Sequence, residues 1–274
     1  VRVAVKSAHF ILLTGEVNMA EIDDVRYEVA VANRVLSKVG LATGVLASLG
    51  HASLRVPGEP EKFVVKGRGY AIDALALMQP KDMVTCDLEG YWIDGPPGSS
   101  QCFEIKMHSV IYKEHPEVQS IVHVHPRYVT MMSVLGRTLV PMCNEGIQLV
   151  RVPLPVYPHS KLILTEEDGQ GVASTIGDSQ AALLRGHGAV TTGINLEQSV
   201  MNMLHLEEQA KMNWYAYCAA GPGYKGIPEA DIVEANNQPT LADLDHFSGG
   251  PYDRGNAGPG GAWKYYTHLV SRDL

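Results

Sequence analysis

Apolar residues recur at two spacings along the chain, which predicts a mixture of helices and strands. Between Glu21 and Val39 they recur every three or four residues, the spacing of one helix face, and Gly40 ends the pattern. The segments 51–56 and 119–125 instead alternate or run continuously apolar, as β-strands do. Because strands and helices are interspersed throughout the first 220 residues, the pattern predicts an α/β fold.

The same criteria predict the remaining elements of this α/β domain. Further helices are expected at 104–115, at 130–135, from 165, and from 195 to about 218. Further strands are expected at 63–65, in a hairpin at 83–93, near residues 140 and 152, and at 181–185. Asn195 is a favoured N-cap for the longest helix, and Gln198 stands where a capping box has its glutamate or glutamine.

From Gly221 onward the periodic pattern ends, and Gly, Pro, Asn and Asp become frequent. Large apolar groups nevertheless persist in this stretch: Tyr224, Phe247, Tyr252 and Trp263. Such groups, with little local structure to bury them, favour association. We therefore predict a domain over residues 20–220 and a C-terminal arm over residues 221–274 that packs on the domain or on a neighbouring subunit.

Charge and composition exclude several classes of function. The 274 residues carry 22 Lys and Arg against 30 Asp and Glu, a net charge of −8, which is a poor match for a nucleic-acid backbone but allows a small anionic substrate. We expect no membrane partner, because no apolar run reaches the ~18–20 residues of a membrane helix. The apolar stretch 8–13 lacks a following A-x-A site, so we expect no signal peptide. The four scattered cysteines suggest a reducing cytoplasm.

The strongest local signal for chemistry is the pair His123 and His125. Their segment, Ser-Ile-Val-His-Val-His-Pro, is strand-forming, and the proline ends it. Because side chains alternate across a strand, histidines two residues apart point to the same face, where they can chelate one divalent metal ion. The alternative is a pair of polar residues on a half-exposed strand, and the pair alone does not decide between these interpretations.

His187 strengthens the metal interpretation. It lies between Gly186 and Gly188 at the end of a buried-type strand, where the glycines allow close backbone approach and leave the imidazole uncrowded. A third nitrogen ligand beside an open coordination position is typical of catalytic metal sites.

Glu104 opens the helix ahead of the His-x-His strand. It is either a residue that stabilises the helix dipole or a fourth ligand that can also transfer protons. His108 lies one turn later on the same helix face. It is either an outer-shell residue that orients a ligand or a satisfied core histidine.

Together, Glu104-x-x-x-His108, His123-x-His125-Pro and Gly-His187-Gly resemble the class II aldolase/adducin family over residues 25–215. The resemblance implies an α/β/α sandwich with a central, mainly antiparallel sheet. It also implies one divalent metal per subunit (Zn²⁺, Mn²⁺, Fe²⁺ or Co²⁺) on His123, His125 and His187, with Glu104 as ligand or catalytic acid. Homotetramers with the active site near a subunit interface are usual there. Adducin-like members without activity lack these histidines, which favours an enzyme.

The sequence departs from the sugar-phosphate aldolases of that family. Those enzymes hold phosphate with an Asn in a G-N-x-S segment, a Ser-Gly loop and two serines before the catalytic Glu. Here His51 replaces the Asn, and Cys102 and Phe103 replace the serines. Phe103 offers a stacking face. The cations that can pair with substrate carboxylates are Lys66, Arg68, Arg127 and His51, although each is alternatively a solvated charge.

These departures resemble the decarboxylase branch of the family. The function predicted is a metal-dependent lyase that decarboxylates an ortho-hydroxy aromatic or pyridine dicarboxylate, such as a dihydroxyphthalate, in aromatic catabolism. Glu104, His51 or His159 is expected to protonate the product. The alternatives are a sugar-phosphate aldolase or epimerase, a non-haem iron oxygenase on the same scaffold, and a metal-free interaction protein of the adducin type.

Overall fold

A computed structural model describes residues 19–247 and 261–274. The strands are β1 (His51–Val56), β2 (Glu59–Lys66), β3 (Met83–Asp87), β4 (Trp92–Asp94), β5 (Ser120–Val124), β6 (Val156–Tyr157), β7 (Ala181–Leu184) and β8 (Gly188–Gly193). The helices are α1 (Met19–Lys38), α2 (Ile105–Glu114), α3 (Arg127–Val134), α4 (Ile147–Val150), α5 (Glu166–Ile176), α6 (Leu196–Ala220), α7 (Glu229–Asn236) and α8 (Gly261–Val270).

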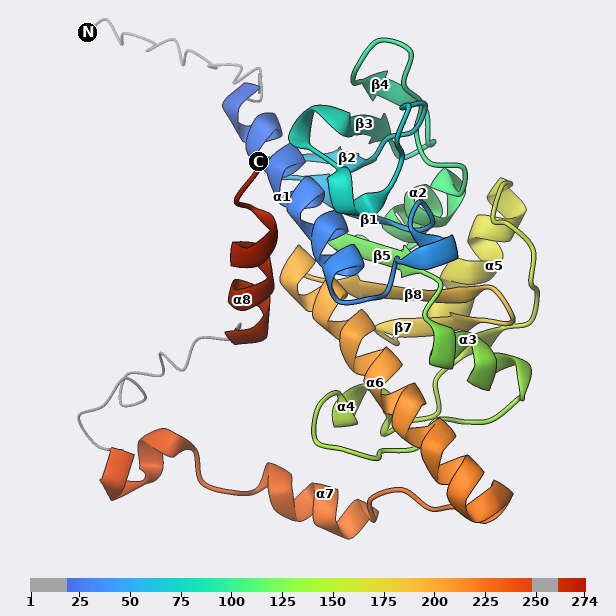
Figure 1. Cartoon of the computed structure of the whole chain (residues 1–274), viewed down its shortest axis with the longest axis vertical. Helices are drawn as coiled ribbons and strands as arrows, with labels where there is room; N and C mark the ends of the chain where they lie inside the picture. Colours follow the sequence, from blue (N-terminus) through green and yellow to red (C-terminus); the bar gives the residue numbers. More distant parts are fainter. Residues whose placement is uncertain (1–18, 248–260) are drawn as a thin grey trace, which may run out of the picture.

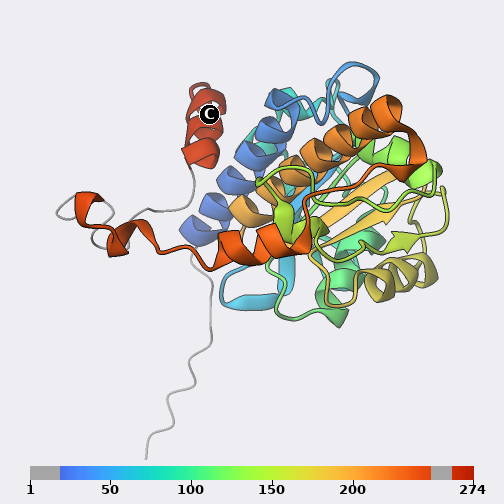
Figure 2. The same ribbon diagram turned by 90° about the horizontal axis from the view of Figure 1, so that it is seen from below.

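One mainly antiparallel sheet forms the centre of the fold, with the strand order β4-β3-β2-β1-β5-β8-β7-β6. Only the short pair β6–β7 is parallel among the described strands. Two helical layers cover this sheet: α1 and α6 lie on one face, and α2 and α5 lie on the other (Figures 1 and 2). The prediction of an α/β/α sandwich is therefore confirmed.

Strand alternation divides the buried side chains between the two faces. In β1, Ala52 and Leu54 belong to the apolar cluster under α1 and α6, whereas Ser53 hydrogen-bonds to side chains of α2. In β5, Val122 and Val124 point toward α1 and α6, so His123 between them points toward α2. The centre of the sheet thus presents polar side chains to α2 within an otherwise apolar core.

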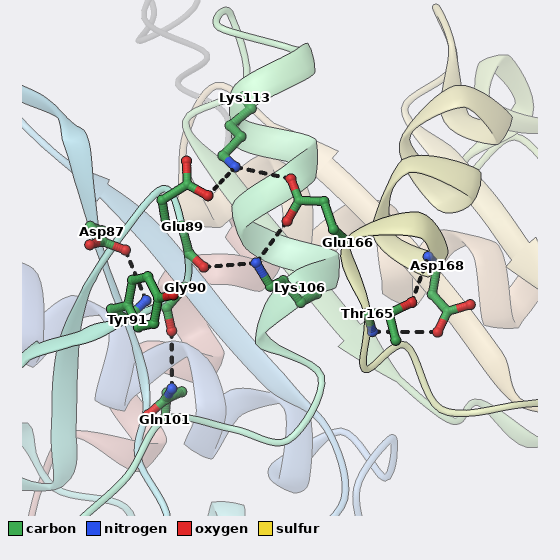
Figure 3. Close-up of polar contacts among 10 residues, drawn as sticks. All are labelled: Asp87, Glu89, Gly90, Tyr91, Gln101, Lys106, Lys113, Thr165, Glu166 and Asp168. Carbon is green, nitrogen blue, oxygen red and sulfur yellow. Dashed lines mark hydrogen bonds and ion pairs between the residues drawn. The ribbon is translucent and has the colours of Figure 1, made fainter.

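Ion pairs join α2 to the start of α5 (Figure 3). Lys106 and Lys113, both on α2, contact the two carboxylate oxygens of Glu166 at 2.7 Å and 3.0 Å. The Thr165 hydroxyl caps α5 by accepting a hydrogen bond from the Asp168 amide at 3.1 Å. With the two helices held together in this way, the residues just before them also meet, because Glu104 accepts a hydrogen bond from the Ile163 amide.

Parts of the C-terminal arm contact the domain of the same chain. The Ile227 amide donates to the Pro141 carbonyl at 2.8 Å, and Arg151 pairs with Glu229 of α7. Helix α8 lies beside α1, where Arg34 donates to the Val270 carbonyl at 3.0 Å (Figure 1). Part of the predicted arm, including Tyr252, lies outside the described residues. None of the described helices combines the length and the apolar run that a bilayer crossing requires.

Two strand predictions were wrong, and two strands, β6 and β8, were missed. The described chain has no strand near residue 140 or 152. Instead, the Val140 backbone is hydrogen-bonded by the Asn213 side chain, and the Met142 amide donates to Gln209. The amide side chains of α6 thus satisfy backbone groups that a neighbouring strand would otherwise bind. Strand β8 was missed because its sequence, Gly-Ala-Val-Thr-Thr-Gly, lacks alternation and has a glycine at each end.

Candidate metal centre

Three histidines and one carboxylate converge at the end of β5. One ligand atom from each of Glu104, His123, His125 and His187 lies within 4.8 Å of the other three. The Nε2 atoms of His123 and His125 are 3.1 Å apart. The two Glu104 carboxylate oxygens lie 3.3 Å from His123 Nε2 and 3.5 Å from His187 Nε2. The four residues come from three separate segments, so the sheet topology brings them together.

The turn that carries His187 depends on its two glycines. Gly186 has a φ of +64°, a conformation that side chains rarely adopt. A side chain at Gly188 would place its Cβ 2.4 Å from the Val124 carbonyl oxygen and 3.1 Å from the His125 Cα. Glycine at 188 therefore lets the β7–β8 turn lie directly against the end of β5, which brings His187 to His123 and His125.

Glu104 occupies the N-cap position of α2, yet its side chain makes no capping hydrogen bond. The carboxylate is buried, accepts the Ile163 amide at 3.0 Å and faces the histidines. Burial raises the pKa of Glu104, but His123, His187 and His51 outweigh burial and hold it well below its ordinary value. The carboxylate is therefore ionised and directed at the cluster, which is the arrangement of a ligand rather than of a helix-dipole residue.

The ring nitrogens are prepared for a metal ion. His123 Nδ1 is 2.9 Å from the Ala189 carbonyl and donates to it, which leaves Nε2 free to face the cluster. Burial, with repulsion from His123 and His187, lowers the pKa of His125 to about 3, so its imidazole is neutral. Both buried ring nitrogens of His187 lack a hydrogen-bond partner among the described residues. Unpartnered buried nitrogens are costly, and a metal ion would satisfy one here. Three imidazoles and a carboxylate suit Zn²⁺, Mn²⁺, Fe²⁺ or Co²⁺.

A chain of buried polar side chains extends from this centre into the core. His51 pairs with His123 across β1 and β5, and its Nδ1 is 2.6 Å from His108 Nε2. His108 Nδ1 in turn hydrogen-bonds to Ser53 at 2.7 Å, and Ser53 bonds to the Tyr112 hydroxyl at 2.8 Å. Sequence reasoning did not include Ser53 and Tyr112. Their spacing is the signal: Ser53 shares a strand face with His51, and Tyr112 lies one helical turn after His108.

A second potential metal-binding group, His51, Cys102 and His108, is better explained by this hydrogen-bonded chain. Its two histidines already bond to each other. Burial raises the pKa of Cys102, so the thiol is protonated rather than in the thiolate form that binds metal.

The predicted substrate-binding residues fall into two groups. Lys66 is 1% exposed and forms an ion pair with Asp73, which also contacts Arg68 at 3.2 Å. The Arg68 guanidinium lies over the Phe103 ring, 4.2 Å from its centroid, and that ring is 63% exposed. Lys66, Arg68 and Phe103 therefore form one cluster, in which Asp73 was not anticipated.

The second group is exposed to solvent. Arg127 is exposed at the first turn of α3, two residues after His125. His159 is exposed, with its ring 5.0 Å from that of Tyr157. The loop that carries His159 borders the centre, because Ile163 donates to Glu104.

Comparison with known proteins agrees with this geometry. Residues 27–214 match the family model described as the class II aldolase and adducin N-terminal domain. A 3,4-dihydroxyphthalate decarboxylase of Arthrobacter keyseri is 30% identical over 218 residues, which cover 76% of this chain and 85% of that protein. A 3-oxo-tetronate 4-phosphate decarboxylase of Escherichia coli is 29% identical over 181 residues, covering 63% and 78%. The structure of an L-fuculose 1-phosphate aldolase from Glaciozyma antarctica superposes with a TM-score of 0.69 at 22% identity, covering 97% and 94%.

Proposed function

Because the chain belongs to the class II aldolase and adducin family, we propose that it is a divalent-metal-dependent carboxy-lyase in aromatic catabolism. Its proposed substrate is an ortho-hydroxy aromatic or pyridine dicarboxylate, such as a dihydroxyphthalate. The observation that carries the proposal is the four-residue centre of Glu104, His123, His125 and His187. Only strand β1 separates β5, which carries His123, from β2, which ends at Lys66 of the Lys66–Arg68–Phe103 cluster. The similarity to a 3,4-dihydroxyphthalate decarboxylase supports the same substrate class.

His123, His125, His187 and Glu104 would hold the metal ion. When bound, a divalent ion supplies Lewis acidity toward a phenol oxygen and the adjacent carboxylate, which favours loss of CO₂. His123 is fixed for this role by its hydrogen bond to the Ala189 carbonyl. The neutral imidazole of His125 presents a lone pair without first releasing a proton.

The cationic cluster binds the rest of the substrate. The Phe103 ring and the Arg68 plane offer stacking surfaces, and Arg68 has guanidinium donors suited to a carboxylate. Lys66 and Arg68 share one carboxylate, Asp73, so two positive charges are balanced by one negative charge. The surplus positive charge can pair with one carboxylate of the substrate. Arg127, exposed two residues after His125 in the sequence, is a further cation proposed to meet the substrate.

Protonation of the product carbon falls to Glu104, His51 or His159. His51 is buried beside His123, and its hydrogen bond to His108 fixes the orientation of its ring. Glu104 combines ligand and proton-transfer roles if it shifts away from the centre during the reaction. His159 is exposed and would act from the loop that borders the site.

Assembly and location complete the proposal. We propose a homotetramer with the site near a subunit interface, as is usual in the family. All four cysteines are unpaired, in keeping with a reducing cytoplasm.

Metal binding gives the first test. We expect His187→Ala to lower bound Zn²⁺ or Co²⁺ to well below one ion per subunit and to abolish decarboxylation while the far-UV circular dichroism stays unchanged. The control is His115→Ala, because His115 lies at the far end of α2. This variant should bind as much metal as the wild type. Wild-type metal content in His187→Ala would overturn the assignment.

Some proteins similar to this chain are named for phosphate-bearing substrates. They motivate a second candidate function, a sugar-phosphate decarboxylase or aldolase. Incubation with fuculose 1-phosphate tests it through the release of an aldehyde. The oxygenase alternative would require O₂ uptake.

A further inference from the structure

Helix α3 connects two of the proposed metal ligands. It begins at Arg127, two residues after His125. Near its other end, the Ser133 hydroxyl accepts a hydrogen bond from the Gly186 amide at 3.1 Å, and Gly186 directly precedes His187. Ser133 is buried, and its hydroxyl also donates to the Thr130 carbonyl of its own helix at 2.6 Å. The Ser133 side chain is therefore fixed and presents its oxygen to the turn that carries His187.

The ring of His187 packs edge-on against the rings of His123 and His125, but no hydrogen bond from the described residues fixes its orientation. His123 is oriented by its hydrogen bond to the Ala189 carbonyl, but neither ring nitrogen of His187 has such a partner among the described residues. The position of His187 therefore depends on its backbone. That backbone is held by the hydrogen bond from the His187 amide to the Leu184 carbonyl and by the contact of Gly186 with Ser133.

The other end of α3 is held from outside the helix. Pro126 occupies its N-cap position and provides no side-chain cap. Glu207, on α6, takes over this role: its carboxylate accepts the Tyr128 amide at 3.0 Å and the Val129 amide at 3.0 Å. The carboxylate thus binds amides that the first turn leaves unpaired and lies at the positive end of the helix. This contact fixes the start of α3, and with it the backbone that follows His125.

We propose that Glu207 and Ser133 are positioning residues, which use α3 as a brace to hold His125 and His187 at metal-binding separation. The inference rests on the proposed metal centre, but neither residue touches the four ligands. Outer-shell groups that orient metal ligands typically change metal affinity by 10–100-fold. Without this brace, the turn that carries His187 is placed by the pairing of β8 with β5 and β7, which ends at Ala189 and Gly188.

The test measures metal affinity rather than activity. The full-length protein is stripped of metal, and the Kd for Zn²⁺ is determined by competition with a chromogenic chelator. The visible spectrum of the Co²⁺-loaded protein reports the coordination geometry. We expect Ser133→Ala and Glu207→Ala each to raise the Kd about 10-fold or more and to alter the Co²⁺ spectrum. Glu207→Gln keeps one acceptor oxygen and should restore the affinity to within a few-fold of wild type.

The chain provides matched controls. Ser109 is a buried helical serine whose hydroxyl has no hydrogen-bond partner among the described residues. Glu208 is exposed next to Glu207 and pairs with Lys211 at 3.7 Å. Ser109→Ala and Glu208→Ala should leave the Kd and the spectrum unchanged.

Stability measurements separate positioning from a general loss of structure. If the brace positions the ligands, the rise in Tm on adding Zn²⁺ shrinks in Ser133→Ala, because weaker binding stabilises the fold less. Unchanged Kd, spectrum and Zn²⁺-induced rise in Tm in Ser133→Ala and Glu207→Ala would overturn the brace while leaving the metal centre intact. A wild-type protein that binds neither Zn²⁺ nor Co²⁺ would instead overturn the metal centre itself.

Discussion

At the scale of single residues, the sequence motifs predicted the candidate metal ligands. The structure shows the neighbouring residues that orient them. Strand spacing pointed to His123 and His125, and the family resemblance grouped them with His187 and Glu104; the four side chains converge in space. Ser133 and Glu207 could not be predicted, because they act through contacts with residues 53 and 78 positions away in the chain. A carboxylate that caps a helix on another element leaves no local signal in the sequence.

Glu104 provides the residue-scale prediction. Glu104→Gln keeps the shape and the acceptor for the Ile163 amide but removes the ionisable carboxylate. If Glu104 transfers protons in the chemical step, kcat falls about 10²–10⁴-fold, and KM changes far less. Steady-state kinetics at saturating metal measure both. Recovery of the wild-type rate on adding excess metal would contradict the proton-transfer role and leave Glu104 as a ligand alone.

At the scale of elements, local rules succeeded where a cap or a long periodic pattern dominates. The α6 N-cap was predicted, and Asn195 accepts a hydrogen bond from the Gln198 amide at 2.8 Å. The boundaries of β1 were also predicted. The strand predicted near residue 140 failed because Asn213 and Gln209, some 70 residues away, bind that backbone. Pattern reasoning cannot anticipate hydrogen bonds supplied by a distant helix.

The capping box of α5 is predicted to contribute to stability. Thr165→Ala removes the acceptor for the Asp168 amide and should lower the free energy of unfolding by about 1 kcal/mol. Urea unfolding followed by circular dichroism measures the change. Thr175→Ala, in the last turn of the same helix, is a control for the loss of a threonine. An unfolding midpoint for Thr165→Ala that equals that of wild type would contradict the prediction.

Asp168 adds a pH dependence to this helix end. Its hydrogen bond with Lys161, and that with Thr165, outweigh burial and lower its pKa. A carboxyl whose pKa is lower in the folded state stabilises the protein above its unfolded pKa of about 3.9, and this contribution disappears as the pH falls through the folded pKa. The Tm difference between wild type and Asp168→Asn should therefore be full near pH 7 and shrink below about pH 4. A difference that stays constant to the lowest measurable pH would contradict this.

At the scale of the whole molecule, the order of strands could not be read from the sequence. Strands β1 and β5, which carry His51 and His123, are neighbours although some 60 residues separate them. Strand β8 pairs with the other edge of β5. Non-local pairings of this kind depend on packing across the sheet rather than on any local pattern. The family resemblance, rather than periodicity, supplied the expectation of a mainly antiparallel sheet.

The C-terminal arm gives the prediction at this scale. Truncation after Ala220 removes α7 and α8, together with the contacts of Glu229 with Arg151 and of Val270 with Arg34. We expect a smaller oligomer or a loss of activity, because truncation would remove the contacts that the arm makes with a neighbouring subunit in the proposed homotetramer. Light scattering coupled to gel filtration, with an activity assay on the same fractions, measures both. A truncated particle of unchanged mass and full activity would contradict a role for the arm in assembly.

The central claim is that this metal centre removes CO₂ from an ortho-hydroxy aromatic or pyridine dicarboxylate. The most direct measurement follows CO₂ release and O₂ uptake together, with a panel of dihydroxyphthalates and hydroxypyridine dicarboxylates and with fuculose 1-phosphate as control. We predict metal-dependent CO₂ release from at least one aromatic substrate in the absence of O₂, with no aldehyde formed from the sugar phosphate. Obligatory O₂ uptake, or cleavage of the sugar phosphate without decarboxylation of any aromatic acid, would contradict the account.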